Sequence, residues 1–357
     1  MQRVTSGSGA WSYVGCPVNP SATIRKTPED FVVEEIPAFE PSGEGEHLYL
    51  RITKTNSTTN DAVKRVCAAL GVDERGAGYA GMKDKRAVTT QTISVPFPRG
   101  RSPEEALGLD VEGVTITAAT RHPHKLKPGH LKGNRFTIVL RDLAADDVPG
   151  AIDKLEEAGR RGVPNAFGAQ RFGKDGDNPE RALAWLAGRT PGPKDRRDRR
   201  LLFSALQAHV FNRVLDIRRA EGTYRQPLMG DLIKKTDTGG LFLCTDPTAD
   251  ELRAERGEIA PTGPIFGAKM RWPEGEPAKI EREMLRECVG DETAFDAHPA
   301  LGEGSRRPFV LRVSELVAHP VGEDPGALRV LFVLPKGGYA TTLLNWAVDL
   351  HEQMVIR

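Results

Sequence analysis

The sequence predicts a fold of strands and helices in which one domain is interrupted by a second domain inserted into it. Runs of alternating and β-branched residues, typical of strands, occur between residues 31 and 141 and return between residues 310 and 334. The stretch between these two regions differs in composition, because it is rich in glycine, proline and arginine and carries an amphipathic helix. Strand patterns early and late, with a different middle, indicate a discontinuous domain.

The chain of 357 residues is long enough for one large or two ordinary domains. Its 50 basic and 49 acidic side chains nearly balance, so any site for a polyanion must come from local clustering. The four cysteines, Cys16, Cys67, Cys244 and Cys288, form no Cys-x-x-Cys pair, which argues against structural zinc and favours a reducing compartment. No apolar run has the length of a signal-peptide core or a membrane span. We therefore expect a soluble, cytoplasmic protein.

The first part of the chain is predicted to contain several strands and one helix. After a lead-in over residues 1–22 that shows no periodicity, the predicted strands are residues 31–37, 48–54, 88–95, 114–118 and 137–141. Residues 59–70 are predicted to form a helix, which Thr59 or Asn60 can cap at its start and Gly71 can end.

One short stretch of this first part concentrates polar residues that suit chemistry. Asp84 follows the small-residue turn at residues 76–81, and three cations flank it: Lys83, Lys85 and Arg86. Nearby cations favour the ionised carboxylate, which suits a nucleophile or an electrostatic anchor better than a proton donor. Taken alone, the stretch is more typical of an aspartate that caps a turn on a solvated surface, because turns attract aspartate for local reasons.

The same turn also matches the letters of a nucleotide-binding motif. Gly76, Gly78 and Gly81 fit the dinucleotide fingerprint G-x-G-x-x-G. The context differs, because no buried strand precedes the glycines and a predicted strand, not a helix, follows them. No helix N-terminus would then receive a pyrophosphate, so we reject a nucleotide-binding fold.

A strongly basic stretch precedes the strand predicted at residues 137–141. Residues 121–136 hold five cations and three histidines but no acid. Because this run is one-sided and is broken by proline and glycine, we interpret it as a phosphate-binding loop and not as a solvated face. The histidine spacing matches no familiar set of metal ligands, so no metal site is predicted.

The middle and the end of the chain alternate between helical and irregular patterns. The predicted segments are, in order, a helix at 147–162, an irregular stretch at 163–173, a helix at 178–188, a basic loop at 189–200 and an amphipathic helix at 203–217. Residues 222–305 contain many turn signals and are expected to be rich in loops. Strands then return at 310–316 and 328–334, followed by a glycine turn and a helix within residues 335–344.

Six of these stretches, in the same order, resemble the TruD family of tRNA pseudouridine synthases. The most specific are Gly78 to Gln91, which contains Gly-Met-Lys-Asp, and Val163 to Gly173, which contains Phe-Gly-Ala-Gln-Arg-Phe-Gly. The others are Lys26 to Pro37 around Pro-Glu-Asp-Phe, Leu131 to Arg141 around Gly-Asn-Arg-Phe, Leu202 to Asn212, and Lys336 to Thr341. A chance match to one stretch is plausible, whereas six in order across nearly the whole chain are not.

The resemblance implies the fold, the domains and the partners. We expect an α+β catalytic domain of the pseudouridine-synthase type, with a mixed and mostly antiparallel sheet, interrupted by the family's own α/β insertion domain. The implied boundaries are 1–159 and 314–357 for the catalytic domain and 160–313 for the insertion. The implied substrate is tRNA, with uridine-13 of a glutamate-type tRNA as the target in bacterial relatives. We expect no cofactor, no metal and no membrane contact, and a monomer, although no sequence pattern bears on the oligomeric state.

The resemblance also assigns roles to individual residues. Asp84 falls at the position of the catalytic aspartate, while Phe31, Asn134, Tyr339 and Arg25 fall at substrate-contact positions, Arg25 near the carboxylate. Uracil must be detached from C1′ and reattached through C5, so the base has to leave its stack and enter a pocket. A carboxylate can attack the substrate covalently, and aromatic faces can hold the base while it turns.

Basic residues around this pocket are expected to contact RNA phosphates. The predicted phosphate contacts are Lys83, Lys125, Lys127, Lys132, Arg135 and Arg171. Two positions depart from the family pattern. Tyr339 stands where many members carry phenylalanine, and Asn345-Trp346 replaces an Arg-Glu pair.

Two other classes of function stay open from the residues alone. The first is a non-catalytic RNA-binding or RNA-folding protein on the same scaffold, which the intact Lys83-Asp84 pair disfavours. The second is a nucleoside glycosidase with a carboxylate nucleophile. A hydrolase of that kind normally brings a second carboxyl group for the leaving group, and this stretch has only one.

Overall fold

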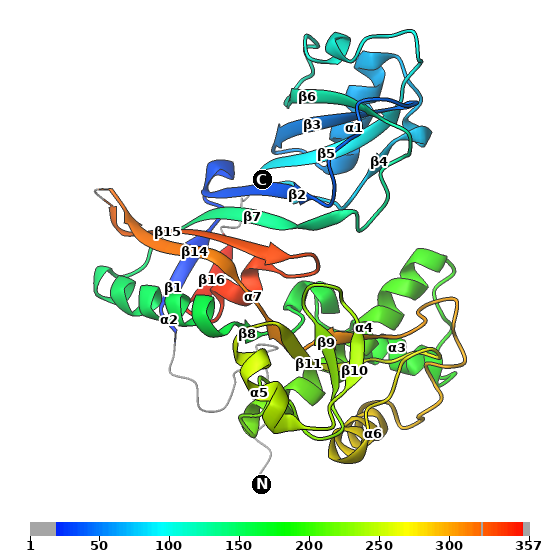
Figure 1. Cartoon of the computed structure of the whole chain (residues 1–357), viewed down its shortest axis with the longest axis vertical. Helices are drawn as coiled ribbons and strands as arrows, with labels where there is room; N and C mark the ends of the chain where they lie inside the picture. The colour runs from blue at the N-terminus through cyan, green and yellow to red at the C-terminus, as the bar shows by residue number, and fades with distance from the viewer. Residues whose placement is uncertain (1–18, 323, 353–357) are drawn as a thin grey trace. The chain divides into compact units, whose positions relative to one another are not determined.

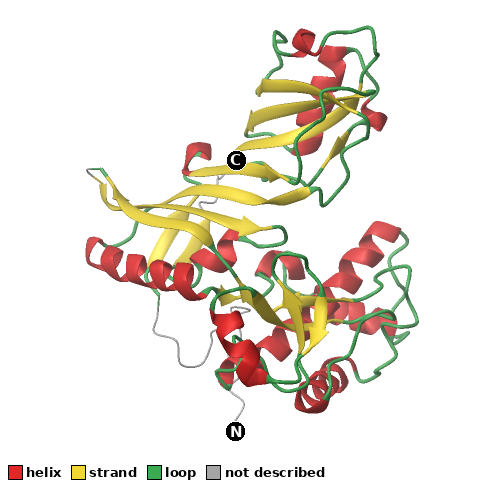
Figure 2. Cartoon of the chain, in the orientation of Figure 1, coloured by secondary structure: helices red, strands yellow, loops and turns green. Residues whose placement is uncertain are grey.

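The computed structural model describes residues 19–322 and 324–352, and this part of the chain divides into two compact units. The split unit consists of the described residues up to 160 and from 312 onward, and the inserted unit consists of residues 161–311. The sequence places the corresponding junctions at 159/160 and 313/314. Most of the lead-in predicted at residues 1–22 lies outside the described residues, and residues 21–22 begin a strand. Figures 1 and 2 show the elements of both units.

The split unit is built on an eight-stranded sheet. Along the sheet the strands are β14 (Ser314–Val321), β15 (Asp324–Pro335), β7 (Leu131–Leu140), β2 (Phe31–Pro37), β5 (Val88–Pro96), β3 (His47–Thr55) and β6 (Val114–His122), with β4 (Gly78–Tyr79) paired to β5. The pair β2–β5 is parallel and the other pairs are antiparallel. The prediction of a mixed, mostly antiparallel sheet is therefore confirmed.

Helix α1 (Thr59–Leu70) forms one core of the split unit by covering one end of the sheet. Its buried residues, including Val63 and Val66, pack against apolar side chains of β3, β5 and β6. The helix bounds match the prediction, but the cap is Thr58, whose hydroxyl accepts from the Asp61 backbone N–H at 3.1 Å. Gly71 ends the helix with φ +64°, the left-handed conformation that glycine adopts without a Cβ clash.

The remaining elements of the split unit are shorter or flank the sheet. They are helices α2 (Val148–Arg161) and α7 (Ala340–Leu344) and the parallel strand pair β1 (Ser21–Ile24) and β16 (Asp349–Glu352). The junction residue Arg161, the last of α2, belongs to the inserted unit. The glycine turn predicted before the last helix is present, with φ +83° at Gly337. The pair β1–β16 brings the two ends of the described chain together.

The inserted unit has its own four-stranded antiparallel sheet and its own helices. The strands, in sheet order, are β10 (Leu241–Leu243), β9 (Leu232–Lys235), β11 (Ile259–Ile265) and β12 (Ser305–Pro308), with a separate pair β8 (Val163–Pro164) and β13 (Val310–Leu311). The helices are α3 (Asn178–Leu186), α4 (Arg196–Ala220), α5 (Pro247–Glu255) and α6 (Gly275–Val289). Helix α4 carries the core, because Phe203 and Phe211 are fully buried among aromatic rings.

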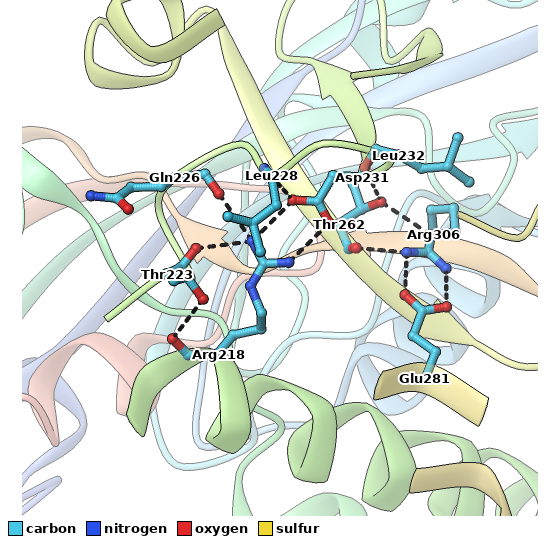
Figure 3. A network of polar contacts seen from close by, with 9 residues as sticks. All are labelled: Arg218, Thr223, Gln226, Leu228, Asp231, Leu232, Thr262, Glu281 and Arg306. Atoms are coloured by element: carbon cyan, nitrogen blue, oxygen red, sulfur yellow. Dashed lines mark hydrogen bonds and ion pairs between the residues drawn. The ribbon is translucent and has the colours of Figure 1, made fainter. Parts of the chain in front are cut away.

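A buried polar network crosses the core of the inserted unit (Figure 3). Arg306 donates to both oxygens of Glu281 at 2.6 and 2.8 Å and also to the Thr262 carbonyl at 2.6 Å. Arg218 pairs with Asp231 at 2.9 Å, and both side chains are at most 2% exposed. Burying charges is costly unless they are paired and hydrogen-bonded, and here each guanidinium meets a carboxylate and a main-chain carbonyl. The network therefore ties α4, α6, β11 and β12 into one unit.

The structure departs from the predicted elements in several places. Residues 222–305 are rich in turns and loops, as predicted, but they also contain β9, β10, α5, β11 and α6, which were not predicted. The basic stretch at 121–136 is not a single loop, since β6 extends to His122 and β7 already begins at Leu131. β7 hydrogen-bonds to β2 on one side and β15 on the other, and these partners hold charged residues in a strand.

The other corrections concern the inserted unit and its junction. The basic loop predicted at residues 189–200 is cut short, because α4 begins at Arg196 with Asp195 as its cap. The strand predicted at residues 310–316 is two strands. Val310–Leu311 pairs with β8 in the inserted unit, whereas β14 starts at Ser314 in the split unit. Within the described residues, no helix is both long and apolar enough to cross a membrane.

Candidate active site

Asp84 lies on the loop between β4 and β5, and buried side chains hold the backbone of this loop. The Gln91 amide donates to the Gly81 carbonyl at 3.3 Å, and the Thr59 hydroxyl accepts the Lys83 backbone N–H at 2.9 Å. The Thr59 hydroxyl in turn donates to Gln91 Oε1 at 2.9 Å. Both Thr59 and Gln91 are buried. The hydrogen bonds of these two buried side chains therefore hold the loop backbone in one conformation.

The side chain of Lys83 points into the fold. Its ammonium pairs with Glu35 Oε2 at 2.8 Å, with Lys83 6% and Glu35 0% exposed at the side chain. The other Glu35 oxygen accepts the Thr92 backbone N–H at 3.1 Å. Glu35 is on β2 and Thr92 on β5, so the pair attaches the loop to the centre of the sheet. The role of Lys83 as a phosphate contact stays a prediction, and in this structure its charge is taken up by Glu35.

A second buried lysine, Lys54 on β3, reaches the loop from the other side. Its side chain is completely buried, and its ammonium donates to the Asp84 carbonyl at 2.8 Å and to the Ser57 carbonyl at 2.6 Å. Burial lowers the pKa of Lys54 from 10.5 to about 8, although the nearby Asp84 charge works in the opposite direction. Lys54 was not among the residues singled out from the sequence.

The carboxylate of Asp84 is half exposed and faces Arg25. The distance from Asp84 Oδ1 to the Arg25 guanidinium is 3.3 Å, and the side chains are 50% and 7% exposed. Arg25 is held in place by an ion pair with Glu352 and by the ring of Phe31, 4.0 Å below its guanidinium carbon. Its backbone has φ +58°, an uncommon conformation for a residue other than glycine. An accessible carboxylate beside a fixed cation suits nucleophilic attack.

The substrate-contact residues predicted from the sequence lie in different surroundings. Phe31 is 1% exposed and makes an edge-on contact with Phe136 at 6.3 Å. Tyr339 is 40% exposed, in the turn after β15. Asn134 lies on β7 with its Oδ1 buried and without a hydrogen-bond partner. In the sheet register Asn134 stands between Glu35 of β2 and Leu334 of β15, so it shares one end of the sheet with the Glu35–Lys83 pair.

The residues predicted to contact phosphates differ in their exposure and in the partners they already have. Lys125, Lys127 and Lys132 are exposed. Arg135 pairs with Glu315 of β14 at 2.8 Å. Arg171 belongs to the inserted unit, where its guanidinium lies 5.6 Å from the Phe167 ring. The lysines are therefore the part of the set that is open to a ligand.

Aromatic and imidazole rings gather beside these lysines. The Phe39 ring lies 5.1 Å from His122 and 5.9 Å from His130, and the Tyr49 ring lies 4.8 Å from His122. The Gly129 backbone N–H donates to the Ala80 carbonyl at 2.8 Å, which joins the lysine-bearing stretch to the loop of Asp84. Rings interleaved with cations are typical of surfaces that bind single-stranded nucleic acid.

Comparison with known proteins decides the family. The sequence model for tRNA pseudouridine synthase D (TruD) matches residues 15–180 and 195–345. The chain belongs to the TruD family. This confirms the resemblance drawn from the sequence motifs, and with it the enzyme class: the protein is a pseudouridine synthase, an isomerase.

Individual relatives agree with this membership of the TruD family. A tRNA pseudouridine synthase D of Anaeromyxobacter sp. (strain Fw109-5) is 45% identical over 329 residues, covering 90% of this chain and 91% of the relative. The tRNA pseudouridine synthase D of Thermus thermophilus (strain ATCC 27634) is 43% identical over 324 residues, covering 90% and 87%. A crystal structure of a TruD protein from Methanosarcina mazei superimposes with a TM-score of 0.73 at 23% identity, covering 93% and 94%. The last comparison shows the fold.

The TruD motifs on the sequence pointed to Asp84 but not to the side chains that hold it. Glu35, Lys54 and Thr59 contact the loop, and none of them was selected as a site residue. Gln91 is the last residue of the matched stretch around Lys83-Asp84, so its position in this stretch could have identified it as a site residue. For Glu35 and Lys54 no local signal existed, because each lies in an ordinary strand pattern. In the described part of the chain, His, Cys, Asp and Glu side chains form no cluster that could hold a metal ion.

The burial of Phe31 gives a first testable prediction. Phe31→Ala removes a fully buried ring and the support of Arg25, so we expect the free energy of unfolding to fall by about 3–5 kcal/mol. A thermal melt together with a turnover rate checks this. If the variant melts like the parent protein and only turnover falls, by about 1–3 kcal/mol in activation free energy, Phe31 is a stacking partner of the base and not a core residue.

Proposed function

We propose that this chain converts a uridine of tRNA, uridine-13 of a glutamate-type tRNA, to pseudouridine, with Asp84 as the nucleophile. The observation that carries the proposal is the half-exposed Asp84 carboxylate, which lies on a loop anchored by buried side chains and faces the Arg25 guanidinium at 3.3 Å. The names of the relatives, tRNA pseudouridine synthase D, support tRNA as the substrate.

The proposed chemistry needs an accessible anion next to an open space. In the reaction the C1′–N1 bond breaks and a C1′–C5 bond forms, while C5 loses a proton and N1 gains one. The Asp84 carboxylate attacks the substrate and is released at the end, so the enzyme is regenerated without a net change. Arg25 stabilises the negative charge and sets the direction of the carboxylate, because Glu352 and Phe31 hold its guanidinium.

Substrate contacts are proposed around this carboxylate. Tyr339 is an exposed ring that can stack on the flipped base. Asn134 has an unpartnered amide oxygen that can accept a hydrogen bond from a base edge. Phe31 is also proposed as a base contact, and this role requires that Arg25 move away, because the Arg25 guanidinium covers the face of the Phe31 ring. The exposed lysines would hold RNA phosphates, and the ring cluster around Phe39 would suit an unstacked base beside them.

The target is tested with transcripts of a glutamate tRNA. The purified protein is incubated with the transcript and with a copy in which uridine-13 is replaced by cytidine, and pseudouridine is mapped by chemical modification and primer extension. We expect one modified site, at position 13, which is absent from the cytidine copy. Modification elsewhere would reject the position, and free uracil as a product would reject the isomerase chemistry.

The exposed lysines give a prediction about salt dependence. Changing Lys125, Lys127 and Lys132 to Ala should weaken tRNA binding and lower the slope of log affinity against log salt by about 0.7–0.9 for each lost phosphate contact. Binding titrations at several salt concentrations measure this slope. Lys64→Ala, an exposed lysine of α1, is the control and should leave the slope unchanged. An unchanged slope in the triple variant would mean that these lysines form a solvated face.

A further inference from the structure

The buried ammonium of Lys54 is an unusual feature of the split unit. Its side chain is 0% exposed, and the acceptors that the structure gives it are two main-chain carbonyls, those of Ser57 and Asp84. Taking an ammonium out of water costs several kcal/mol, which carbonyl dipoles offset only in part. An apolar side chain of similar length would fill the same space on β3 without that cost. The charge therefore suggests a role beyond packing.

The position of the two acceptors indicates that role. Ser57 precedes α1, and Asp84 carries the proposed nucleophile, so one ammonium joins the start of a helix to the reactive loop. The bond to the Asp84 carbonyl fixes the peptide group that directly follows its Cα. Arg25 contacts the same residue at the carboxylate, 3.3 Å away. Asp84 is thus held at the backbone by Lys54 and at the side chain by Arg25.

We propose that Lys54 is a positioning residue that holds Asp84 in its reactive geometry through the backbone carbonyl, and that loss of its proton releases the loop and limits turnover at alkaline pH. The proposal rests on Asp84 being the nucleophile. Lys54 does not contact the reacting atoms, so its effect comes from orientation. Displacements of about 1 Å at a reacting group can lower a rate by about 100-fold.

The charged groups around Lys54 set the pH range of this effect. Asp84 and Asp61 favour the protonated form, and Lys83 of the same loop disfavours it. Burial is the largest influence and brings the pKa to about 8. Above that pH the neutral amine keeps two N–H groups but loses the charge that strengthens both hydrogen bonds. The hold of Lys54 on the Asp84 loop therefore weakens as the pH rises through about 8.

The same pKa distinguishes a loosened loop from an unfolded protein. The pKa of Lys54 is lower in the folded chain than its ordinary value of 10.5. Between about pH 8 and 10.5 the unfolded chain holds the proton more strongly than the folded chain does, so this residue's contribution to stability rises with pH there. A fall in turnover across this window, with no fall in melting temperature, therefore does not come from unfolding.

The test uses single-turnover rates of the full chain at saturating tRNA between about pH 6.5 and 9.5. We expect the parent rate to fall with a midpoint near 8. Lys54→Met keeps the length of the side chain without the charge, and we expect its rate to be about 10–100-fold lower, with an affinity for tRNA within about twofold of the parent. The alkaline fall should be absent from this variant. Lys64→Met, the same substitution at an exposed position of α1, should behave like the parent protein.

Several outcomes would overturn the proposal. A parent rate that stays level to about pH 9.5 would do so, and this measurement does not depend on whether Lys54→Met folds. A Lys54→Met rate equal to the parent rate would also do so. An alkaline fall that persists in the variant would assign it to the substrate or to another group. If Asp84→Asn is inactive while Lys54→Met is normal, only this inference fails, whereas an active Asp84→Asn removes the proposed nucleophile itself.

Discussion

We expect Asp84→Asn to abolish pseudouridine formation while tRNA binding stays within about twofold of the parent protein. The substitution keeps the size of the side chain and one of its two acceptor oxygens, so the loop and its contacts to Lys54, Thr59 and Gln91 are preserved. It removes the anion that we propose attacks the substrate, and an amide cannot replace a carboxylate in covalent catalysis. Turnover is measured by tritium release from tRNA labelled at C5 of uridine.

The binding measurement makes this result specific. Asp84 is 50% exposed at its side chain, so its replacement should leave the melting temperature nearly unchanged. Loss of turnover with normal binding and normal melting identifies a chemical role. Measurable pseudouridine formation by the pure Asn variant would exclude Asp84 as the nucleophile. A matched change at the exposed Asp153 of α2, Asp153→Asn, serves as the control and should retain turnover.

Glu281→Ala is expected to destabilise the inserted unit by about 3–5 kcal/mol. Glu281 is 2% exposed and receives two hydrogen bonds from Arg306, which is itself 5% exposed (Figure 3). Without the carboxylate, the guanidinium is buried with only its bonds to Thr262, at the main-chain carbonyl and the hydroxyl. Calorimetry is the suitable measurement, because a chain with two compact units need not unfold in a single transition.

A control on the same helix separates burial from charge. Glu276→Ala breaks the exposed pair with Lys279 on α6, where the two side chains are 66% and 69% exposed. Exposed pairs contribute about 0–1 kcal/mol, so this variant should melt nearly like the parent. If Glu281→Ala costs no more than Glu276→Ala, the buried network does not hold the inserted unit together. Replacing Glu281 and Arg306 together by Leu and Met should recover part of the loss, since no charge is then left unpaired.

The local elements of the split unit were predictable because their signals lie between neighbouring residues. Helix α1 has the predicted bounds, since its apolar spacing and Gly71 act within one or two turns. Strand β5 follows the β-branched run that begins at Val88. Within α1 the cap was misplaced by one residue, because Thr58 and Thr59 are both hydroxyl residues and the choice depends on backbone geometry.

The elements of residues 222–305 were missed for the opposite reason. Strands β9 and β10 have four and three residues, too short for a pattern to repeat. Strand β12 receives its hydrogen bonds from β11, about forty positions away along the chain. Helices α5 and α6 are largely polar at the surface, so their apolar faces are narrow. In such segments tertiary partners decide the structure that local preference leaves open.

The sequence by itself determined the family, the discontinuous order of the chain and the residue most suited to chemistry. The Lys-Asp motif around Asp84 is contiguous, so its residue types indicate their chemistry without knowledge of where the loop lies in the fold. Only the tertiary structure decided what holds that residue. Lys54 is 30 positions before Asp84, and the Arg25 contact with Glu352 spans 327 positions. A buried charge finds its partner wherever the sheet brings an acceptor within hydrogen-bond distance, and no spacing along the chain encodes that distance.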